Sequence, residues 1–454
     1  MKSRPLILIL GAGPAGLGAA WRLARRGFQV TLADRAPSVG GNAGSFDCAG
    51  FRADFGSHRL HPSCSPEILS DIRSFLGDDL LDRPRHGRIH LGGRWLHFPL
   101  KAADLVLRAP ASLSFGFARD TLTKPFRNPP TEESFASVLL RGLGPAMCEN
   151  FYFPYARKIW GMEPSELDAE QARRRVAAGS AAKLIGKVLA LLPGFSKPGA
   201  GRFFYPRRGF GQISEAYRDA ALQAGARLLL NTQAEDLLRE DNSALVLSTI
   251  PLTLLARAIQ PAAPPDVLAS ASALRYRAML LVYLVLDTHR FTEFDAHYFP
   301  SGSIRITRLS EPKNYSLHGP SGRTLLCAEL PCHATGDVWR MTNDDLAQLV
   351  RDDLSRAGIP IQSSISHIEV KRLAQAYPIY ERGFRPHFTR LNSWLDTIPR
   401  VVSLGRQGLF AHDNTHHTLA MAYAAADCVG DDGAFDRARW AHARTTFESF
   451  VVED

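Results

Sequence analysis

Three glycines near the N-terminus have the spacing of a dinucleotide-binding turn, Gly11-x-Gly13-x-x-Gly16. The first glycine permits a tight bend, the second lets a pyrophosphate approach the backbone, and the third lets a helix pack closely on a sheet. A carboxylate, Asp34, follows 18 residues after Gly16, where it can accept hydrogen bonds from an adenosine ribose. These residues, together with Ala15 inside the turn, predict a dinucleotide site.

The segments around these glycines predict the elements that position them. Residues Leu6–Leu10 are a continuous apolar run, typical of a fully buried strand. Residues 17–26 are rich in Ala and Leu and predict a helix, whose N-terminal N–H groups and dipole attract phosphate. Residues Val30–Ala33 predict a second buried strand that ends at Asp34. Together they form one βαβ unit, which makes the glycine pattern far more specific than it would be alone.

A second glycine pair favours a cofactor longer than one nucleotide. Arg35 follows Asp34 directly, and Gly40, Gly41 and Asn42 then bring the backbone close to a ligand a second time. This second approach, beyond the ribose site, suits a cofactor that extends further, such as FAD rather than NAD.

A segment near the C-terminus fits the other end of such a molecule. Gly405 and Arg406 follow a predicted strand, and Asn414 and Thr415 precede a predicted helix. An isoalloxazine gains negative charge at its N1/C2 edge when it is reduced, so a nearby Arg or helix N-terminus stabilises reduced flavin.

Two histidines are candidates for catalytic proton transfer, His58 and His61, because imidazole titrates near neutral pH. The alternative for His58 is a histidine that positions backbone and exchanges no proton. Other histidines cluster in HDNTHH, at positions 412, 416 and 417, where we expect them to cap a helix or face the flavin. We predict no metal site.

Two cations and four aromatic residues are candidates for the substrate side. Arg308 and Lys313 suit an anionic group such as a carboxylate or phosphate, although both could be rim charges. The aromatic residues could form an apolar wall or pack in the core, and for Tyr377 we favour the core. These are Tyr155, Trp160, Tyr377 and Tyr380, to which we add His412 as a substrate contact.

The order of these segments predicts an α/β protein with two interleaved domains. Nucleotide-binding segments lie at both ends and in the middle of the chain, and residues 274–330 alternate as antiparallel strands with one solvated face do. We predict a Rossmann-like FAD-binding domain interleaved with an α+β substrate domain. The FAD-binding domain comprises 1–90, 200–255 and 396–454, and the substrate domain comprises 91–199 and 256–395.

Composition excludes several classes of protein. The 454 residues are 45% hydrophobic and 22% charged, as in ordinary globular proteins. The net charge of +9 favours anionic partners, but no long Lys/Arg run indicates nucleic-acid binding. The six cysteines form no dense framework, which predicts free thiols in a reducing compartment.

Nothing in the sequence predicts a signal peptide or a membrane span, so we expect a cytoplasmic protein. Peripheral contact with the inner membrane stays open. Two stretches suggest it, an apolar one at 105–117 and a basic amphipathic one at 183–192, and packing in the core is the alternative for both. The sequence leaves the oligomeric state undetermined.

At its N-terminus the sequence resembles the superfamily of amine oxidase, protoporphyrinogen oxidase and UDP-galactopyranose mutase flavoproteins. Later segments match the same superfamily in order along nearly the whole chain. They are DFGSHRLHPS, RIHLGGRWLHFPL, NFYFPYARKIWGMEPSEL, YPRRGFGQISEA, LVLSTIP, ITRLSEPKNYS, AYPIYERG and GRQGLFAHDNTHHTLAMAYAA. The resemblance implies bound FAD, a glutathione-reductase-like fold and a substrate domain stacked over the isoalloxazine.

The resemblance also implies roles for individual residues. Gly56, Ser57 and His58 match the loop along the flavin, and Ala234 sits where a backbone group meets the adenine. In the mutase branch, Tyr155, Trp160, Arg308 and Arg406 match positions that hold a nucleotide-sugar. The chain departs from that branch at three positions, since a diphosphate-binding Arg falls at Ala178, and a tyrosine and an aspartate fall at His412 and Asn414.

We therefore expect an FAD-dependent oxidoreductase that holds a small, hydrophobic or partly anionic molecule against the isoalloxazine. The alternative is a redox-neutral flavin-dependent mutase acting on a nucleotide-linked sugar. A third reading is a flavin-binding scaffold without catalysis.

Overall fold

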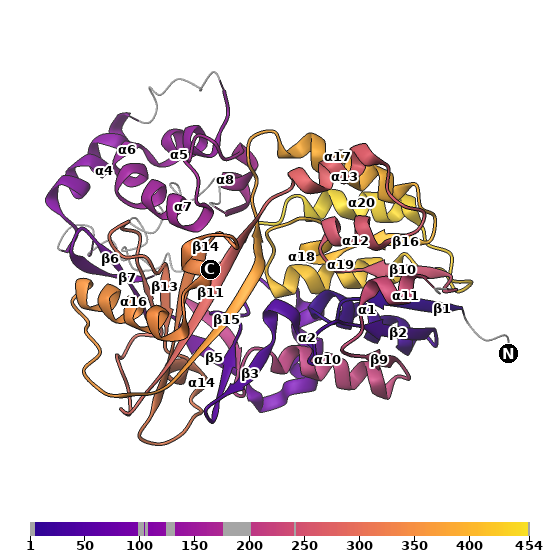
Figure 1. Cartoon of the computed structure of the whole chain (residues 1–454), viewed down its shortest axis with the longest axis horizontal. Coiled ribbons are helices and arrows are strands. Elements are labelled where there is room, and N and C mark those ends of the chain that lie inside the picture. The colour runs from indigo at the N-terminus through magenta and orange to yellow at the C-terminus, as the bar shows by residue number, and fades with distance from the viewer. Residues whose placement is uncertain are drawn as a thin grey trace.

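The computed structural model describes residues 5–98, 104, 108–123, 132–175, 201–239 and 242–452. The amphipathic stretch at 183–192, part of the apolar stretch at 105–117, and Ala178 lie outside these residues. Figure 1 shows two bodies of structure side by side, each built on its own sheet.

The first body contains a five-stranded sheet whose paired strands are all parallel. Its strands are rich in Val, Ile and Leu, as is typical of parallel sheets covered on both faces. In spatial order they are β16 (Val401–Ser403), β10 (Leu245–Ser248), β1 (Leu6–Leu10), β2 (Gln29–Ala33) and β9 (Arg227–Leu229). The predicted βαβ unit is confirmed.

Helices cover both faces of this sheet (Figure 1). On one face the helices share a core with Ile7 and Ile9 of β1. They are α1 (Pro14–Arg25), α2 (Pro66–Leu76), α10 (Gln212–Gln223), α19 (Thr415–Asp427) and α20 (Arg437–Phe447). On the other face the helices pack against Leu8 and Leu10. They are α11 (Ala234–Arg239), α12 (Leu252–Ala258), α13 (Pro265–Ala273) and α17 (Phe384–Asp396).

The second body contains a seven-stranded mixed sheet, in which only β12 and β6 pair in parallel among the described strands. In spatial order the strands are β15 (Ile365–Pro378), β11 (Tyr276–Leu286), β14 (Thr324–Cys332), β13 (Arg308–Ser310), β12 (Ala296–Tyr298), β6 (Gly87–Leu91) and β7 (Arg94–Phe98). The antiparallel strands expected after residue 274 are therefore confirmed.

The solvated face expected for these strands is wrong. Every residue of β14, and every residue of β11 after Tyr276, is buried. Alternate residues of β11 face opposite sides: Leu280 and Val282 pack with helix α16 (Asn343–Arg356), while Leu281 and Tyr283 pack with the hairpin of β3 (Ser45–Cys48) and β4 (Phe51–Asp54). Both faces of β11 and β14 are covered, so these two central strands have no solvated face.

A group of helices packs beside β6 and β7 through a separate apolar core (Figure 1). They are α4 (Ala111–Thr123), α5 (Phe135–Leu143), α6 (Pro145–Met147), the π-helical segment Cys148–Tyr152, α7 (Phe153–Trp160) and α8 (Ala169–Arg175). The smaller elements are β5 (Leu80–Pro84), which pairs with β8 (Arg202–Pro206), α14 (Lys313–Ser316), α15 (Asp337–Arg340), α18 (Gly405–Gly408) and the 3-10 turns at Gly41–Ala43 and Gly77–Asp79.

The chain passes repeatedly between the two bodies, and we keep the interleaved two-domain division as a proposal. Three boundaries need adjustment within it. The boundary expected at residue 90 falls inside β6, which pairs in the seven-stranded sheet, and α13 and α17 pack on the five-stranded sheet. Among the described residues, no helix is long and apolar enough to cross a membrane.

Candidate functional site

A cavity of about 580 Å³ lies where the two sheets meet. One wall follows the carboxyl ends of the parallel strands, at Leu10, Ala33, Thr249 and Gly405. The opposite wall is formed by strands of the seven-stranded sheet, including residues 372–375 of β15. Open α/β sheets bind their ligands at the carboxyl ends of the strands, so this is where a cofactor belongs.

The glycine turn at the start of α1 forms a cradle in this wall. A side chain at Gly16 would place its Cβ 1.9 Å from the carbonyl oxygen of Gly11, so Gly16 lets the helix approach the turn. Gly11 itself has φ +99°, a left-handed conformation that favours glycine. By contrast, a Cβ added to Gly13 would lie 4.0 Å from its nearest described neighbour, the carbonyl oxygen of Gly40. A Cβ added to Gly41 would lie 3.6 Å from the Cα atom of Gly13.

Gly13 and Gly41 therefore leave open space between the turn and the second glycine pair. The helix behind them begins at Gly13 without a side-chain cap. Unsatisfied N–H groups next to an open, side-chain-free surface fit a pyrophosphate. The residues present thus fit the dinucleotide part of FAD.

Asp34 is held at the end of β2 by two backbone amides. Ala12 N donates to its Oδ2 at 2.7 Å and Ala36 N to its Oδ1 at 2.8 Å. Each carboxylate oxygen can accept more than one hydrogen bond, so Asp34 keeps acceptor capacity toward a ribose. Arg35 and Ala234 line the same end of the cavity.

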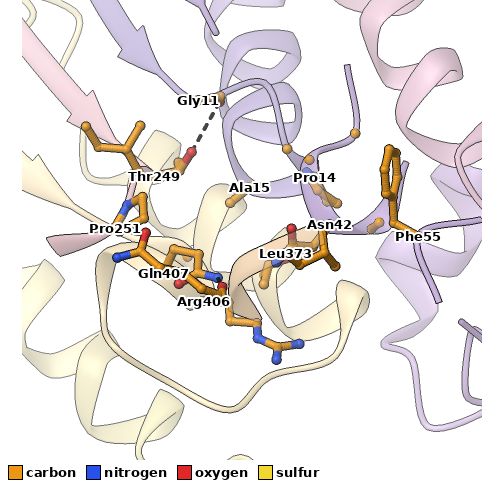
Figure 2. A pocket seen from close by; sticks show the side chains of 18 of the residues that line it. Gly11, Pro14, Ala15, Asn42, Phe55, Thr249, Pro251, Leu373, Arg406 and Gln407 are labelled. Atoms are coloured by element: carbon orange, nitrogen blue, oxygen red, sulfur yellow. Dashed lines mark hydrogen bonds between the residues drawn. The ribbon is translucent and has the colours of Figure 1, made fainter. Parts of the chain in front are cut away.

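The C-terminal motif connects the two walls (Figure 2). An Arg406 guanidinium nitrogen donates to Ala376 O and Gln407 Nε2 donates to Gln375 O, both at 2.9 Å, which ties α18 to β15. Figure 2 shows Arg406 and Gln407 on one side of the cavity, and Pro14, Ala15 and Asn42 on the other. Asn414 and Thr415 line the cavity at the start of α19.

Glu329 organises the loop that the sequence places along a flavin. Its Oε1 accepts hydrogen bonds from Ser57 N at 2.9 Å and from two nitrogens of Arg308 at 2.7 and 3.0 Å. Gly56, Ser57 and Arg308, distant in sequence, therefore meet at one buried carboxylate. Ser57 and Arg308 line the cavity.

Sequence reasoning missed Glu329, although a signal was present. It lies within the apolar run TLLCAELPC, which forms a fully buried strand. A charge in such a strand has to be paired, so an acid there predicts a buried cation or a row of amides.

His58 lines the cavity, with its ring stacked on Phe210 at a centroid distance of 5.3 Å. Its Nε2 lies 2.9 Å from the carbonyl oxygen of Phe55, to which it donates. Burial lowers the pKa of His58, although the carboxylate of Asp54 opposes this shift. His58 is therefore neutral near pH 7, and its Nε2 proton is held by the backbone.

Tyr377 lines the cavity and, as predicted, also packs against the apolar core, where it borders two clusters. The guanidinium carbons of Arg175 and Arg406 each lie 5.0 Å from its ring centroid, which places two cations against one aromatic ring. Trp160 does not line the cavity; it is buried behind it, 5.9 Å edge-to-face from Tyr377 and 5.2 Å from His412.

His412 and Asp413 are fully buried side by side at the cavity wall. Burial, together with the nearby cations Arg175 and Arg406, holds the pKa of His412 well below its ordinary value. Burial raises the pKa of Asp413 to about 6, although Arg174 and Arg406 oppose this shift. Neither carboxylate oxygen of Asp413 has a hydrogen-bond partner among the described residues.

Besides Trp160, four predicted side chains do not line this cavity. His61 Nδ1 contacts Ser63 Oγ at 2.8 Å on an outer turn, and Lys313 donates to the carbonyls of Pro320 and Arg323, closing a loop. Tyr380 is buried, with its hydroxyl on the carbonyl of Phe410. Tyr155 has its ring against Phe151, 5.9 Å away.

The remaining predicted residues converge on the cavity or support its wall. Gly16 and Gly56 support the wall. Those that line it are Gly11, Gly13, Ala15, Asp34, Arg35, Gly40, Gly41, Asn42, Ser57, His58, Ala234, Arg308, Gly405, Arg406, His412, Asn414 and Thr415.

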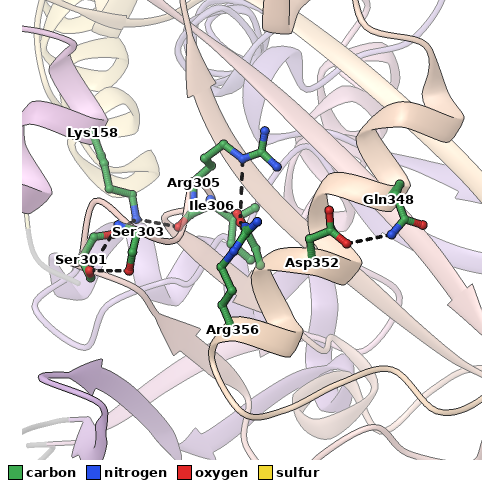
Figure 3. Close-up of polar contacts among 9 residues, drawn as sticks. Lys158, Ser301, Ser303, Arg305, Ile306, Gln348, Asp352 and Arg356 are labelled. Atoms are coloured by element: carbon green, nitrogen blue, oxygen red, sulfur yellow. Dashed lines mark hydrogen bonds and ion pairs between the residues drawn. The ribbon is translucent and has the colours of Figure 1, made fainter.

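The loop that precedes Arg308 is fixed by charged side chains (Figure 3). Lys158 Nζ, from α7, donates to the carbonyls of Phe299, Ser301 and Ile306. From the other side, Asp353 Oδ2 accepts from the backbone amide of Ile306 at 3.0 Å. Lys158 therefore connects the helix that carries Trp160 to the loop that positions Arg308.

Comparison with known proteins agrees with this architecture. A model of the flavin-containing amine oxidoreductase family matches residues 14–427. The crystal structure of a reduced UDP-galactopyranose mutase superposes with a TM-score of 0.79 at 20% identity, over 94% of this chain and 93% of that one. The cyclohexylamine oxidase of Brevibacterium oxydans superposes with a TM-score of 0.65 at 16% identity, over 97% and 100%.

Among curated sequences, the chain is similar to the probable UDP-galactopyranose mutase of Klebsiella pneumoniae. The two are 28% identical over 171 residues, which are 37% of this chain and 44% of that protein. The chain thus spans less than half the length of that relative.

Proposed function

The chain belongs to the family of flavin-containing amine oxidoreductases, and we propose that it uses its FAD to oxidise a small molecule that carries an anionic group. It is a flavin-dependent oxidoreductase. When bound, FAD supplies the two-electron acceptor. The chain's own residues have to bind the substrate, exclude water and hold one proton.

The observation that carries the proposed substrate class is the charge of the substrate wall. Arg175, Arg308 and Arg406 line this part of the cavity, and Asp413 is the acid beside them among the lining residues. A guanidinium can bind a carboxylate or phosphate through two parallel hydrogen bonds, and it does so most strongly where water is excluded. Three guanidiniums around one buried space, of which Arg308 is also paired with Glu329, therefore favour an anionic substrate.

Asp413 is the group best suited to exchange a proton in this cavity. Its pKa, raised by burial to about 6, lies near the pH at which a general acid or base is most effective. Burial lowers the pKa of both His58 and His412, which favours their neutral forms. We propose that Asp413 holds the reaction proton, while His58, catalytic in our sequence-based prediction, accepts a hydrogen bond through Nδ1. His61, the other predicted catalytic residue, lies outside the cavity.

One observation favours the alternative, a redox-neutral mutase on a nucleotide-linked sugar. The diphosphate-binding arginine that sequence register placed at Ala178 has a counterpart in Arg175, which lines the cavity with Arg308. Two arginines facing one space suit a diphosphate, and Tyr377 lies beside one of them.

Anaerobic spectroscopy distinguishes the two functions. The oxidised holoenzyme is mixed with candidate carboxylates, amines, phosphorylated metabolites and nucleotide-sugars, and the visible flavin absorption is followed. Bleaching by a substrate supports oxidation. A compound that is isomerised only by the dithionite-reduced enzyme, without net electron transfer, supports the mutase. If no compound does either, both proposals fail.

Charge variants test the substrate class separately from the chemistry. Arg308→Gln should weaken the binding of anionic ligands, read from the shift they cause in the flavin spectrum, by roughly tenfold or more. Arg305→Gln is the matched control, because Arg305 is on the same loop but does not line the cavity. Equal anion affinity in both variants would contradict the proposed role of Arg308.

A further inference from the structure

A thiol, an imidazole and a carboxylate meet outside the cavity, on the hairpin side of the seven-stranded sheet. They belong to Cys48, His367 and Glu369, and one potential ligand atom from each lies within 4.8 Å of the other two. Cys48 ends β3, and the other two lie on β15. None of the three lines the cavity.

The strand register explains why these residues converge. His367 and Glu369 are two positions apart on β15, so their side chains point to the same face of the sheet. They pair with Val285 and Tyr283 of β11, which pack in the same apolar core as Cys48. The hairpin that carries Cys48 lies on this face, so the thiol is directed at the two β15 side chains.

The donor set is one that zinc prefers, a soft thiolate with an imidazole and a carboxylate. Tetrahedral zinc with bonds of about 2.0–2.3 Å holds its ligand atoms roughly 3.3–3.8 Å apart. The His367 Nε2 to Glu369 Oε2 distance is 3.6 Å, already within that range. The side chains of His367 and Glu369 are 42% and 27% exposed, so both can rotate toward the buried thiol and leave a fourth position to water.

A neighbouring cation supports the carboxylate. Lys371 Nζ forms an ion pair with Glu369 Oε1, which leaves Oε2 facing His367. Ligating carboxylates are commonly held by such a partner on their second oxygen.

We propose that Cys48, His367 and Glu369 bind one Zn²⁺ ion, which ties the β3–β4 hairpin to β15. The hairpin continues into Phe55 and His58, which line the cavity. Strand β15 continues into residues 372–377, which also line the cavity except for Ala376. Zinc at this point would fix two segments of the active-site wall from outside. The site is independent of the identity of the substrate.

The first test is metal content and binding in the holoenzyme. The protein is purified under reducing conditions without chelator, and its zinc is measured by elemental mass spectrometry. It is then stripped and titrated with Zn²⁺ alone and Co²⁺ alone. We expect one equivalent of zinc per chain. We also expect a near-ultraviolet thiolate-to-cobalt absorption in the difference spectrum against the same flavoprotein before cobalt is added.

Three variants locate the metal. Cys48→Ser and His367→Gln should each lower zinc affinity by about 100-fold or more, because each removes a ligand. Cys64→Ser, which changes another buried cysteine, is the control and should bind zinc as the unsubstituted enzyme does. FAD content is measured in parallel to show that each variant folds. His367→Gln alters a half-exposed side chain, so it remains informative if Cys48→Ser fails to fold.

Three outcomes would overturn the proposal. The unsubstituted holoenzyme could take up no zinc, the two ligand variants could bind zinc as tightly as the control, or cobalt could bind without the thiolate absorption. In each case Cys48 would be a buried thiol next to Glu369 and nothing more.

Discussion

Two glycines of the same turn, Gly13 and Gly16, should respond in opposite ways to the smallest possible substitution. In Gly16→Ala the new Cβ would lie 1.9 Å from a backbone oxygen, so either α1 or the turn has to move. In Gly13→Ala the Cβ would have no described neighbour nearer than 4.0 Å, and the backbone at φ −78° and ψ 179° accepts alanine. Only the space for the pyrophosphate is lost.

The magnitudes follow from these distances. Overpacking costs about 1–3 kcal/mol, and the 1.9 Å approach to rigid backbone puts Gly16→Ala at the upper end, a loss of about 3 kcal/mol of folding stability. Gly13→Ala should leave the apoprotein as stable, or more stable by about 0.4–1 kcal/mol, because alanine has less freedom when unfolded. The same overpacking against FAD should weaken its binding by roughly 5- to 150-fold.

Two measurements on each variant separate the effects. Chemical unfolding of the apoprotein gives the free energy of unfolding, and quenching of flavin fluorescence gives FAD affinity. A Gly13→Ala variant that binds FAD normally would show that the pyrophosphate lies elsewhere. A Gly16→Ala variant with unchanged stability would show that the close approach of α1 is not required.

Three further predictions concern single side chains. Arg406→Gln should lower the two-electron reduction potential of the flavin by tens of millivolts, because a cation no longer stabilises the reduced form. For two electrons, 30 mV corresponds to about 1.4 kcal/mol. An unchanged potential in a spectroelectrochemical titration would place Arg406 away from the ring. Burial lowers the pKa of His297 from 6.5 to about 3. Between these two pH values the folded protein binds fewer protons at His297 than the unfolded protein does. The contribution of His297 to folding stability is therefore complete above pH 6.5 and is lost as the pH falls toward 3. Stability should thus fall by up to about 1.4 kcal/mol per pH unit in that window, and His297→Gln should have a shallower slope in acid unfolding curves; equal slopes would contradict the assignment. Lys158→Met should raise the substrate KM about tenfold at unchanged FAD content, since the loop before Arg308 loses its anchor, whereas an unchanged KM would show that Asp353 alone holds the loop.

Local segments of the sequence were predicted well because their structure depends on neighbours in the chain. The run Leu6–Ala33 contains its own strand, turn, helix and strand, and Asp34 follows at a fixed spacing. Strand β15 was missed because its burial alternates irregularly and it carries several charges, so it has no strand-like pattern. It becomes a strand through pairing with β11, about ninety residues earlier.

The sequence by itself determined the glycine turn, the mixed α/β class and most of the predicted residues that line the cavity, since glycine spacing and apolar runs are local physical requirements. Tertiary structure alone decided which charged residues face the cavity. Lys313 closes a loop while Arg308 reaches Glu329, although both were equal candidates in sequence. Asp413 and Tyr377 became site residues only when β15 and the C-terminal motif packed together. The physical reason is that the burial and pairing of a charge depend on strands and loops that the tertiary fold brings together, and composition and spacing do not record that contact.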